Sequence, residues 1–175
     1  MSGHGRSGMA SFKMQGMEAY ENMLSQIASP TTTAQIAGAA IYAGADVVAD
    51  AIRSAIEDIP EVDHRKHGTS EEQLDGITSA QKKGLLEGFG ITPMQEDSGM
   101  FHVKLGFDGY NEVKTKQYPG GQPNAMIARS INSGTSFRKK TRFVDKAAKA
   151  SKGAAEKAMA AAFDKKLAEV ADSSR

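Results

Sequence analysis

The segment from Tyr118 to Phe143 restricts the fold most, because it interrupts the backbone twice around one short helix and ends in a run of cations. Prolines and glycines near its start end any extended structure that precedes them. Residues 124–132 then predict about two and a half helical turns, with Ile127 and Ile131 on one face. Gly134 follows, where a residue with positive φ commonly closes a helix. The segment therefore predicts extended chain, a short helix, a loop and the start of a second helix.

The composition is that of a one-domain protein that packs through small side chains. A length of 175 residues suits a single domain with a proper core. The absence of cysteine excludes disulfides and thiolate metal sites. Aromatic residues make up only 6% and Trp is absent, so alanine must provide much of the packing. We therefore expect thin helical contacts and a core that a partner completes.

The net charge of +1 hides a marked asymmetry along the chain. Residues 1–100 carry 14 Asp/Glu and 7 Lys/Arg, a net charge of −7, whereas residues 101–175 carry 7 and 15, a net charge of +8. Two such halves could pair head to tail between copies, face different partners, or form two solvated faces. The most apolar stretch, residues 36–56, contains charged residues and there is no visible signal peptide, so we expect no membrane span.

Two helices are predicted before the first polar loop. We expect residues 1–12 to form a flexible tail and residues 13–28 a short helix that ends before a proline. Thr31 or Thr32 can cap a long alanine-rich helix that runs to about Ile59, where another proline follows. The small residues of this second helix permit close approach of another element.

The polar segment 60–76 is predicted to be a loop. His64 and His67 are three residues apart and could share a metal, but no third strong ligand is fixed nearby, so we expect a solvated loop. A GxGxxG pattern at residues 3–8 lacks the preceding strand and following helix that a nucleotide site requires. Neither pattern predicts a ligand site.

A β-hairpin is predicted in the middle of the chain. Apolar residues alternate with others from Met100 to Phe107, which indicates a strand. Asp108-Gly109 is a strong hairpin signal. Residues 110–118 would be the returning strand, but their alternation is imperfect, so a protruding arm remains an alternative.

Two more helices complete the expected domain of residues 13–170. Thr78 can cap a helix over residues 79–87, and a helix of about seven turns is predicted over residues 144–170. Residues 171–175 are expected to form a polar tail. The apolar stripe of the long helix is narrow and consists of Val144, Ala148, Ala155, Met159, Phe163 and Leu167.

Motifs for catalysis are absent from the sequence. There is no GxxxxGK[ST], HExxH, EF-hand loop or GxSxG, and no pair of carboxylates lies in an apolar stretch. We therefore expect no enzymatic activity, no cofactor and no metal. Nonspecific contact with nucleic acid stays open, because Arg138, Lys139, Lys140 and Arg142, with Phe137 and Phe143 beside them, could neutralise phosphates.

The second half of the chain resembles a known family. The segments 103–111 (VKLGFDGYN) and 113–140 (VKTKQYPGGQPNAMIARSINSGTSFRKK), followed by 143–147 (FVDKA), are similar to the tail-completion, or neck, proteins of tailed bacteriophages. These are also described as minor capsid or head–tail joining proteins. Asn132 or Ser133 stands near a position that is usually acidic in the family, and Arg142 stands where proline is common.

The resemblance implies an α+β fold in which N-terminal helices and a long C-terminal helix pack on a small antiparallel β-sheet. It implies a virion protein at the head–tail interface, made in the cytoplasm of the bacterial host, that forms a ring with other copies of itself. Portal or adaptor proteins on the head side, and tail terminator or tail tube proteins, would be its partners, with transient nonspecific contact to packaged DNA. The interface or channel residues would be Arg129, Arg138, Lys139, Lys140 and Arg142, and the structural signature Asp108, Gly109, Gly134, Thr135, Ser136 and Phe143. A tail terminator and a nonspecific DNA-binding protein remain the alternatives.

Overall fold

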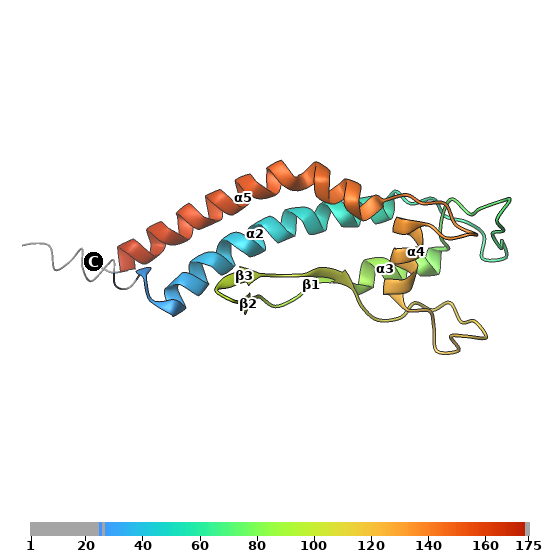
Figure 1. Ribbon diagram of the computed structural model, residues 1–175, viewed down its shortest axis with the longest axis horizontal. Helices are drawn as coiled ribbons and strands as arrows, with labels where there is room; N and C mark the ends of the chain where they lie inside the picture. Colours follow the sequence, from blue (N-terminus) through green and yellow to red (C-terminus); the bar gives the residue numbers. More distant parts are fainter. Residues whose placement is uncertain (1–24, 26, 174–175) are drawn as a thin grey trace, which may run out of the picture.

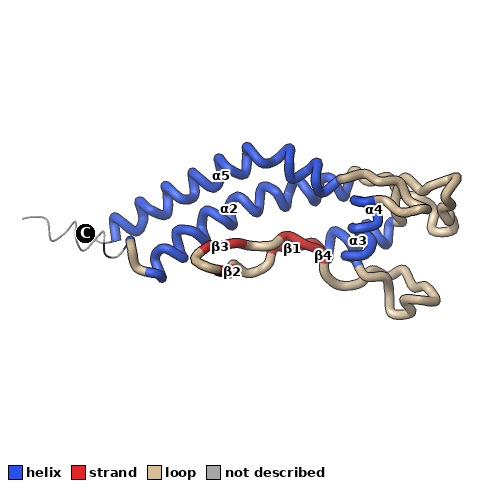
Figure 2. Tube along the Cα trace, in the orientation of Figure 1, coloured by secondary structure: helices blue, strands red, loops and turns tan. Residues whose placement is uncertain are grey.

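Two long helices run side by side in opposite directions along the molecule. The computed structural model describes residue 25 and residues 27–173, and its long helices are α2 (Pro30–Glu57) and α5 (Phe143–Ser173) (Figure 1). The short helices α3 (Ser79–Gly88) and α4 (Asn124–Ser133) lie at one end with the long loops. A narrow β-ribbon runs beside α2 (Figure 2). The expected α+β fold is confirmed, with small antiparallel two-stranded sheets next to the paired long helices.

The first residues of α2 correct the predicted cap. The side chain of Ser29, not of Thr31, is the N-cap, and its hydroxyl accepts a hydrogen bond from the backbone N–H of Thr32 at 3.2 Å. Pro30 occupies the first turn, where its missing N–H costs nothing. The Ser-Pro pair therefore begins α2. The predicted tail over 1–12, most of the predicted helix over 13–28 and the GxGxxG glycines lie outside the described residues.

Small residues let α2 and α5 approach closely. At Gly44 an added Cβ would lie only 2.7 Å from the sulfur of Met159. The buried residues of α5 are offset by one from part of the predicted stripe; they are Phe143, Ala147, Ser151 and Ala155. Beyond them no residue of α5 up to Ser173 is buried, and Met159 and Phe163 are 37% and 44% exposed. Because the helix continues to Ser173, the predicted polar tail begins later than expected.

Residues 100–107, predicted to form one strand, form two short strands, and each of them pairs with a segment that precedes it in the chain. In one antiparallel ladder β1 (Phe89–Ile91) pairs with β4 (Leu105–Phe107), and in the other β2 (Gln95–Asp97) pairs with β3 (Met100–His102). Residues 92–94 face only residues 103–104 between the ladders, a bulge that shifts the register. The turn of this hairpin is Ser98-Gly99, where both φ angles are positive, at 53° and 81°.

The predicted return strand over 110–118 is wrong. Gly109 has the positive φ of a turn, 74°, but the chain then forms an irregular loop with one isolated bridge between Tyr110 and Pro123. Two buried asparagines hold this loop. The side-chain amide of Asn124 donates to the carbonyl of Asp108 at 2.8 Å, and Asn111 accepts from the backbone N–H of Val113 at 3.0 Å.

The hydrophobic core lies where the short helices meet the long ones. Its fully buried large side chains are Ile56, Ile77, Leu85 and Ile131. Aromatic contacts join the ribbon to the start of α5. The ring centroid of Phe107 lies 5.0 Å from that of Phe89 and 6.3 Å from that of Phe143. Ile127 and Ile131, predicted to share one helix face, are both buried in the core, and the predicted capping of α3 by Thr78 is confirmed.

Candidate functional site

The predicted basic segment forms a tight turn against the 60–76 loop. Gly134, with φ of 77°, ends α4, and Thr135 N–H donates to the carbonyl of Arg138 at 2.9 Å. The backbone N–H of Leu74 donates to the carbonyl of Phe137 at 2.9 Å, and that of Lys139 donates to the carbonyl of Leu74 at 2.8 Å. Two segments more than 60 residues apart in the sequence are thereby joined.

The Gly134-Thr135-Ser136 signature serves this junction. The side-chain amide of Gln73 donates to the carbonyls of Thr135 and Ser136 at 2.9 and 3.2 Å. A side chain at position 134 would strain the backbone, because φ is positive there. It would also crowd Lys140, since an added Cβ would lie 3.1 Å from the backbone nitrogen of that residue. Local geometry thus explains the glycine at position 134, and the backbone carbonyls of Thr135 and Ser136 bind Gln73.

The five candidate cations fall into two groups. Arg129, Lys139, Lys140 and Arg142 are exposed and available to a partner. Arg138 is only 6% exposed, and its guanidinium donates to the carbonyl of Gly76. Burial lowers the pKa of Arg138 from its ordinary value. Arg138 therefore holds the loop in place and does not belong to an exposed basic face of this chain.

Acidic side chains lie on the loop next to the basic segment. Residues 60–76 carry five Asp/Glu and two Lys/Arg, and this loop is paired with residues 135–139. Glu72 and Asp75 line one shallow pocket together with Lys66 and Lys139. The charge asymmetry of the sequence is therefore partly cancelled in space at this end. Mixed charge weakens long-range attraction for a polyanion such as DNA.

Asn132 and Arg142 both contribute to the start of α5. The side-chain oxygen of Asn132 accepts from the backbone N–H of Val144 at 3.1 Å, so an uncharged residue caps the helix. Arg142 has a φ of 55°, which proline cannot adopt, and its backbone N–H donates to the carbonyl of Asn132 at 3.1 Å. Its guanidinium lies 3.5 Å from the carboxylate of Asp145.

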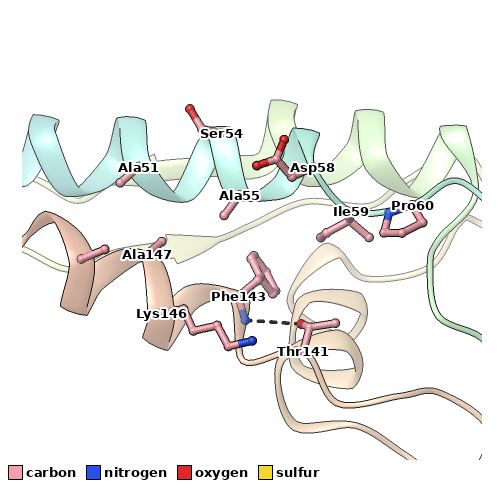
Figure 3. A pocket seen from close by; sticks show the side chains of 11 residues that line it. Ala51, Ser54, Ala55, Asp58, Ile59, Pro60, Thr141, Phe143, Lys146 and Ala147 are labelled. Atoms are coloured by element: carbon pink, nitrogen blue, oxygen red, sulfur yellow. Dashed lines mark hydrogen bonds between the residues drawn. The ribbon is translucent and has the colours of Figure 1, made fainter.

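A shallow groove of about 470 Å³ separates the end of α2 from the start of α5 (Figure 3). Its lining is mainly alanine with Ile59, Pro60 and Phe143, and Asp58 and Lys146 add one charge of each sign. Phe143 N–H donates to the hydroxyl of Thr141 at 3.3 Å at the groove's lower side. Ser54 and Thr141 are the uncharged polar residues of the lining.

No metal-type cluster of three or more His, Cys, Asp or Glu side chains is present in the described part of the chain. His64 and His67 are both exposed. The Nδ1 atom of His64 lies 3.4 Å from the carboxylate of Asp63. A hydrogen bond from Arg65 lowers the pKa of Asp63. Asp63 thus engages its neighbours in the loop, whereas Glu61 lies 3.3 Å from Lys82 of α3.

One described helix, α2, is long and apolar enough to cross a membrane when judged by length and composition only. Core helices of water-soluble proteins meet the same criterion. Eight residues of α2 are buried within the fold, and the helix lies along α5 over most of its length. Packing within the domain therefore accounts for its apolar character.

Comparison with known proteins gives no match to a family model, a curated protein or a solved structure.

Proposed function

We propose that this chain is a structural protein of the tailed-bacteriophage neck, which joins the tail to the head and continues the DNA channel. The resemblance in residues 103–147 motivates the proposal. The observation that carries it is the distal half of α5, a long helix that leaves apolar side chains exposed. Other copies of the chain, arranged in a ring, would cover them.

The distal half of α5 packs on α2 through Met159 but has no buried residue after Ala155 up to Ser173. All four buried residues of this 31-residue helix lie between Phe143 and Ala155. The following residues include Met159 and Phe163, which are four positions apart and therefore on one face. Neighbouring exposed apolar side chains of this kind often mark contact surfaces. A ring of copies would bury this face between adjacent helices.

The exposed cations suit a channel wall rather than a high-affinity DNA site. Lys139 and Lys140 project from the junction turn, and Arg129 lies on α4. Screened, nonspecific attraction would let packaged DNA pass without holding it. The acidic loop beside the turn limits the attraction further. A free DNA-binding role is therefore the less favoured alternative.

Microscopy of phage lysates tests the proposed role directly. A stop codon would be placed in this gene of the phage that encodes it, and the lysate would be examined by negative stain. The proposal predicts DNA-filled heads beside separate tails of normal length. Tails of irregular or excessive length would indicate a tail terminator instead, and intact infectious particles would refute a role in the neck.

A variant pair tests the contact surface. We expect Phe163→Ser to prevent ring formation or incorporation into particles, because it removes an exposed apolar anchor. Ala161→Ser changes an exposed position of the same helix and is the control. Sedimentation of the purified proteins and particle assays in complementation would report the effect. Equal assembly of both variants would contradict this use of α5.

A further inference from the structure

A second pocket, of about 360 Å³, lies beneath the 60–76 loop at the loop-bearing end of the molecule. Segments from four parts of the chain form its walls: the loop itself, the start of α3, residues 113–122 and the Phe137-Arg138 turn. The hydrogen bonds between Leu74 and residues 137 and 139 fix one wall against another. The pocket is therefore built by the fold and is not a gap between mobile side chains.

Arg138 lines this pocket as a buried cation without a counter-ion. It is 6% exposed, and no carboxylate of the described residues lies within the 4.0 Å of an ion pair with it. One guanidinium nitrogen donates to the carbonyl of Gly76, whereas Nε is buried without a hydrogen-bond partner. A buried charge of this kind is costly unless it is paired. An anion in the pocket would compensate it.

The rest of the lining has the matching character. Lys66, His64 and His67 line the pocket with Arg138, and no Asp or Glu does. Hydroxyl and amide groups complete it, from Thr78, Gln81, Thr115 and Gln122. The nearby carboxylates do not line this pocket: Asp63 pairs with Arg65 at 3.0 Å and lies 3.4 Å from His64. Glu72 and Asp75 line the adjoining pocket, to which Lys66 and His67 also contribute.

We propose that this pocket binds a small oxyanion, a phosphate or carboxylate group, between Arg138 and the Lys66 side of the loop. Guanidinium and ammonium groups form their strongest hydrogen bonds with such anions. The inference does not depend on the proposed role in the phage neck. Occupancy would fasten the 60–76 loop to the 134–142 turn, so an anion would stabilise the end of the molecule that carries the exposed cations.

Calorimetric titration of the full chain with sodium phosphate, at an ionic strength held constant with sodium chloride, tests the proposal. We expect saturable binding. Lys66→Ala, which changes an exposed loop residue, should weaken it about tenfold or more through the loss of a charge-assisted contact. Arg138→Gln should abolish it. Arg65→Ala is the matched control, because Arg65 is the neighbouring cation, does not line the pocket and should leave binding within about twofold.

Sodium acetate in a parallel titration distinguishes the two kinds of anion. Tighter binding of phosphate would identify a phosphate site, and comparable binding of acetate would identify a carboxylate site. Two results would overturn the proposal: the absence of saturable binding of either anion, or equal weakening by Lys66→Ala and Arg65→Ala. If Arg138→Gln does not fold, the Lys66→Ala and Arg65→Ala pair still decides.

Discussion

Gly84 and Gly153 are both helical, yet replacement by alanine should change stability in opposite directions. Gly84 lies in α3 against the 108–123 loop, and an added Cβ would lie 2.7 Å from Oδ1 of Asn124 and 3.1 Å from Cα of Asn111. Both asparagines are almost fully buried, at 2% and 3% exposure. Gly153 is an exposed residue of α5, where an added Cβ would meet nothing within 4 Å.

The magnitudes follow from these surroundings. Alanine is favoured over glycine in a helix by about 1 kcal/mol, a gain that applies at both positions. At Gly84 this gain opposes an overpacking cost of about 1–3 kcal/mol. Displacement of Asn124 would also break its hydrogen bond to the Asp108 carbonyl, which costs a further 1–3 kcal/mol or so. We therefore expect Gly84→Ala to lower the free energy of unfolding by about 1–5 kcal/mol, and Gly153→Ala to raise it by about 1 kcal/mol.

Urea and thermal unfolding followed by far-UV circular dichroism would measure both variants. For a chain of this length, 1 kcal/mol corresponds to about 2–4 °C in Tm. Equal stabilisation by both substitutions would mean that the loop is not packed on α3 as the structure has it. Destabilisation by Gly153→Ala would contradict the exposure of that face of α5.

Three further results are expected. Arg142→Pro should destabilise the fold by about 3 kcal/mol or more, as measured by urea unfolding, because proline cannot adopt a φ of 55° or donate to the Asn132 carbonyl; an unchanged midpoint would refute this. Phe143→Ala should cost about 3–5 kcal/mol in the same assay, since the ring is 95% buried and contacts Phe107. NMR titration of the carboxyl groups should give Asp63 a pKa below its usual value, and Arg65→Ala should raise this pKa. The lowered pKa stabilises the folded state above the ordinary pKa of the carboxyl, and this stabilisation is lost as the pH falls through the lowered value.

Local signals in the sequence predicted the helices well. The side chain of Thr78 accepts a hydrogen bond from the backbone N–H of Gln81, and the side chain of Gln81 accepts one from the backbone N–H of Thr78. This reciprocal cap lies within four consecutive residues. Gly134 likewise has the positive φ expected at the end of α4. Such features are visible without the fold because all the interacting groups are close in the sequence.

The pairing of the strands was missed. The strand partner of Met100–His102 is Gln95–Asp97, three exposed polar residues without the alternation that marks a strand. The dipeptide at 108–109 does turn the chain, but Asn124 from α4 then binds the carbonyl of Asp108 and directs the next residues into a loop. Tertiary contacts therefore decide whether a loop or a return strand follows this turn.

The burial of Arg138 also depended on a distant segment. In the sequence it belongs to a basic run that is expected to be solvated, whereas in the fold its guanidinium binds the Gly76 carbonyl, 62 residues away. No neighbouring residue signals this. The partial cancellation of charge between the 60–76 loop and the basic segment has the same origin, because composition counts charges without placing them.

The two ends of the molecule pose different physical problems. The end with α3 and α4 shares a core with the end of α2 and the start of α5, and its loops are joined by backbone hydrogen bonds. The distal half of α5 is rich in alanine and lysine, which favour a helix without tertiary contacts. Met159 packs against Gly44 of α2, which accounts for its apolar side chain. Helix formation does not explain why Phe163 is apolar, since lysine would serve as well at an exposed position and would increase solubility. A contact between copies in the proposed ring would cover Phe163 and would give a reason for an apolar residue at this exposed position.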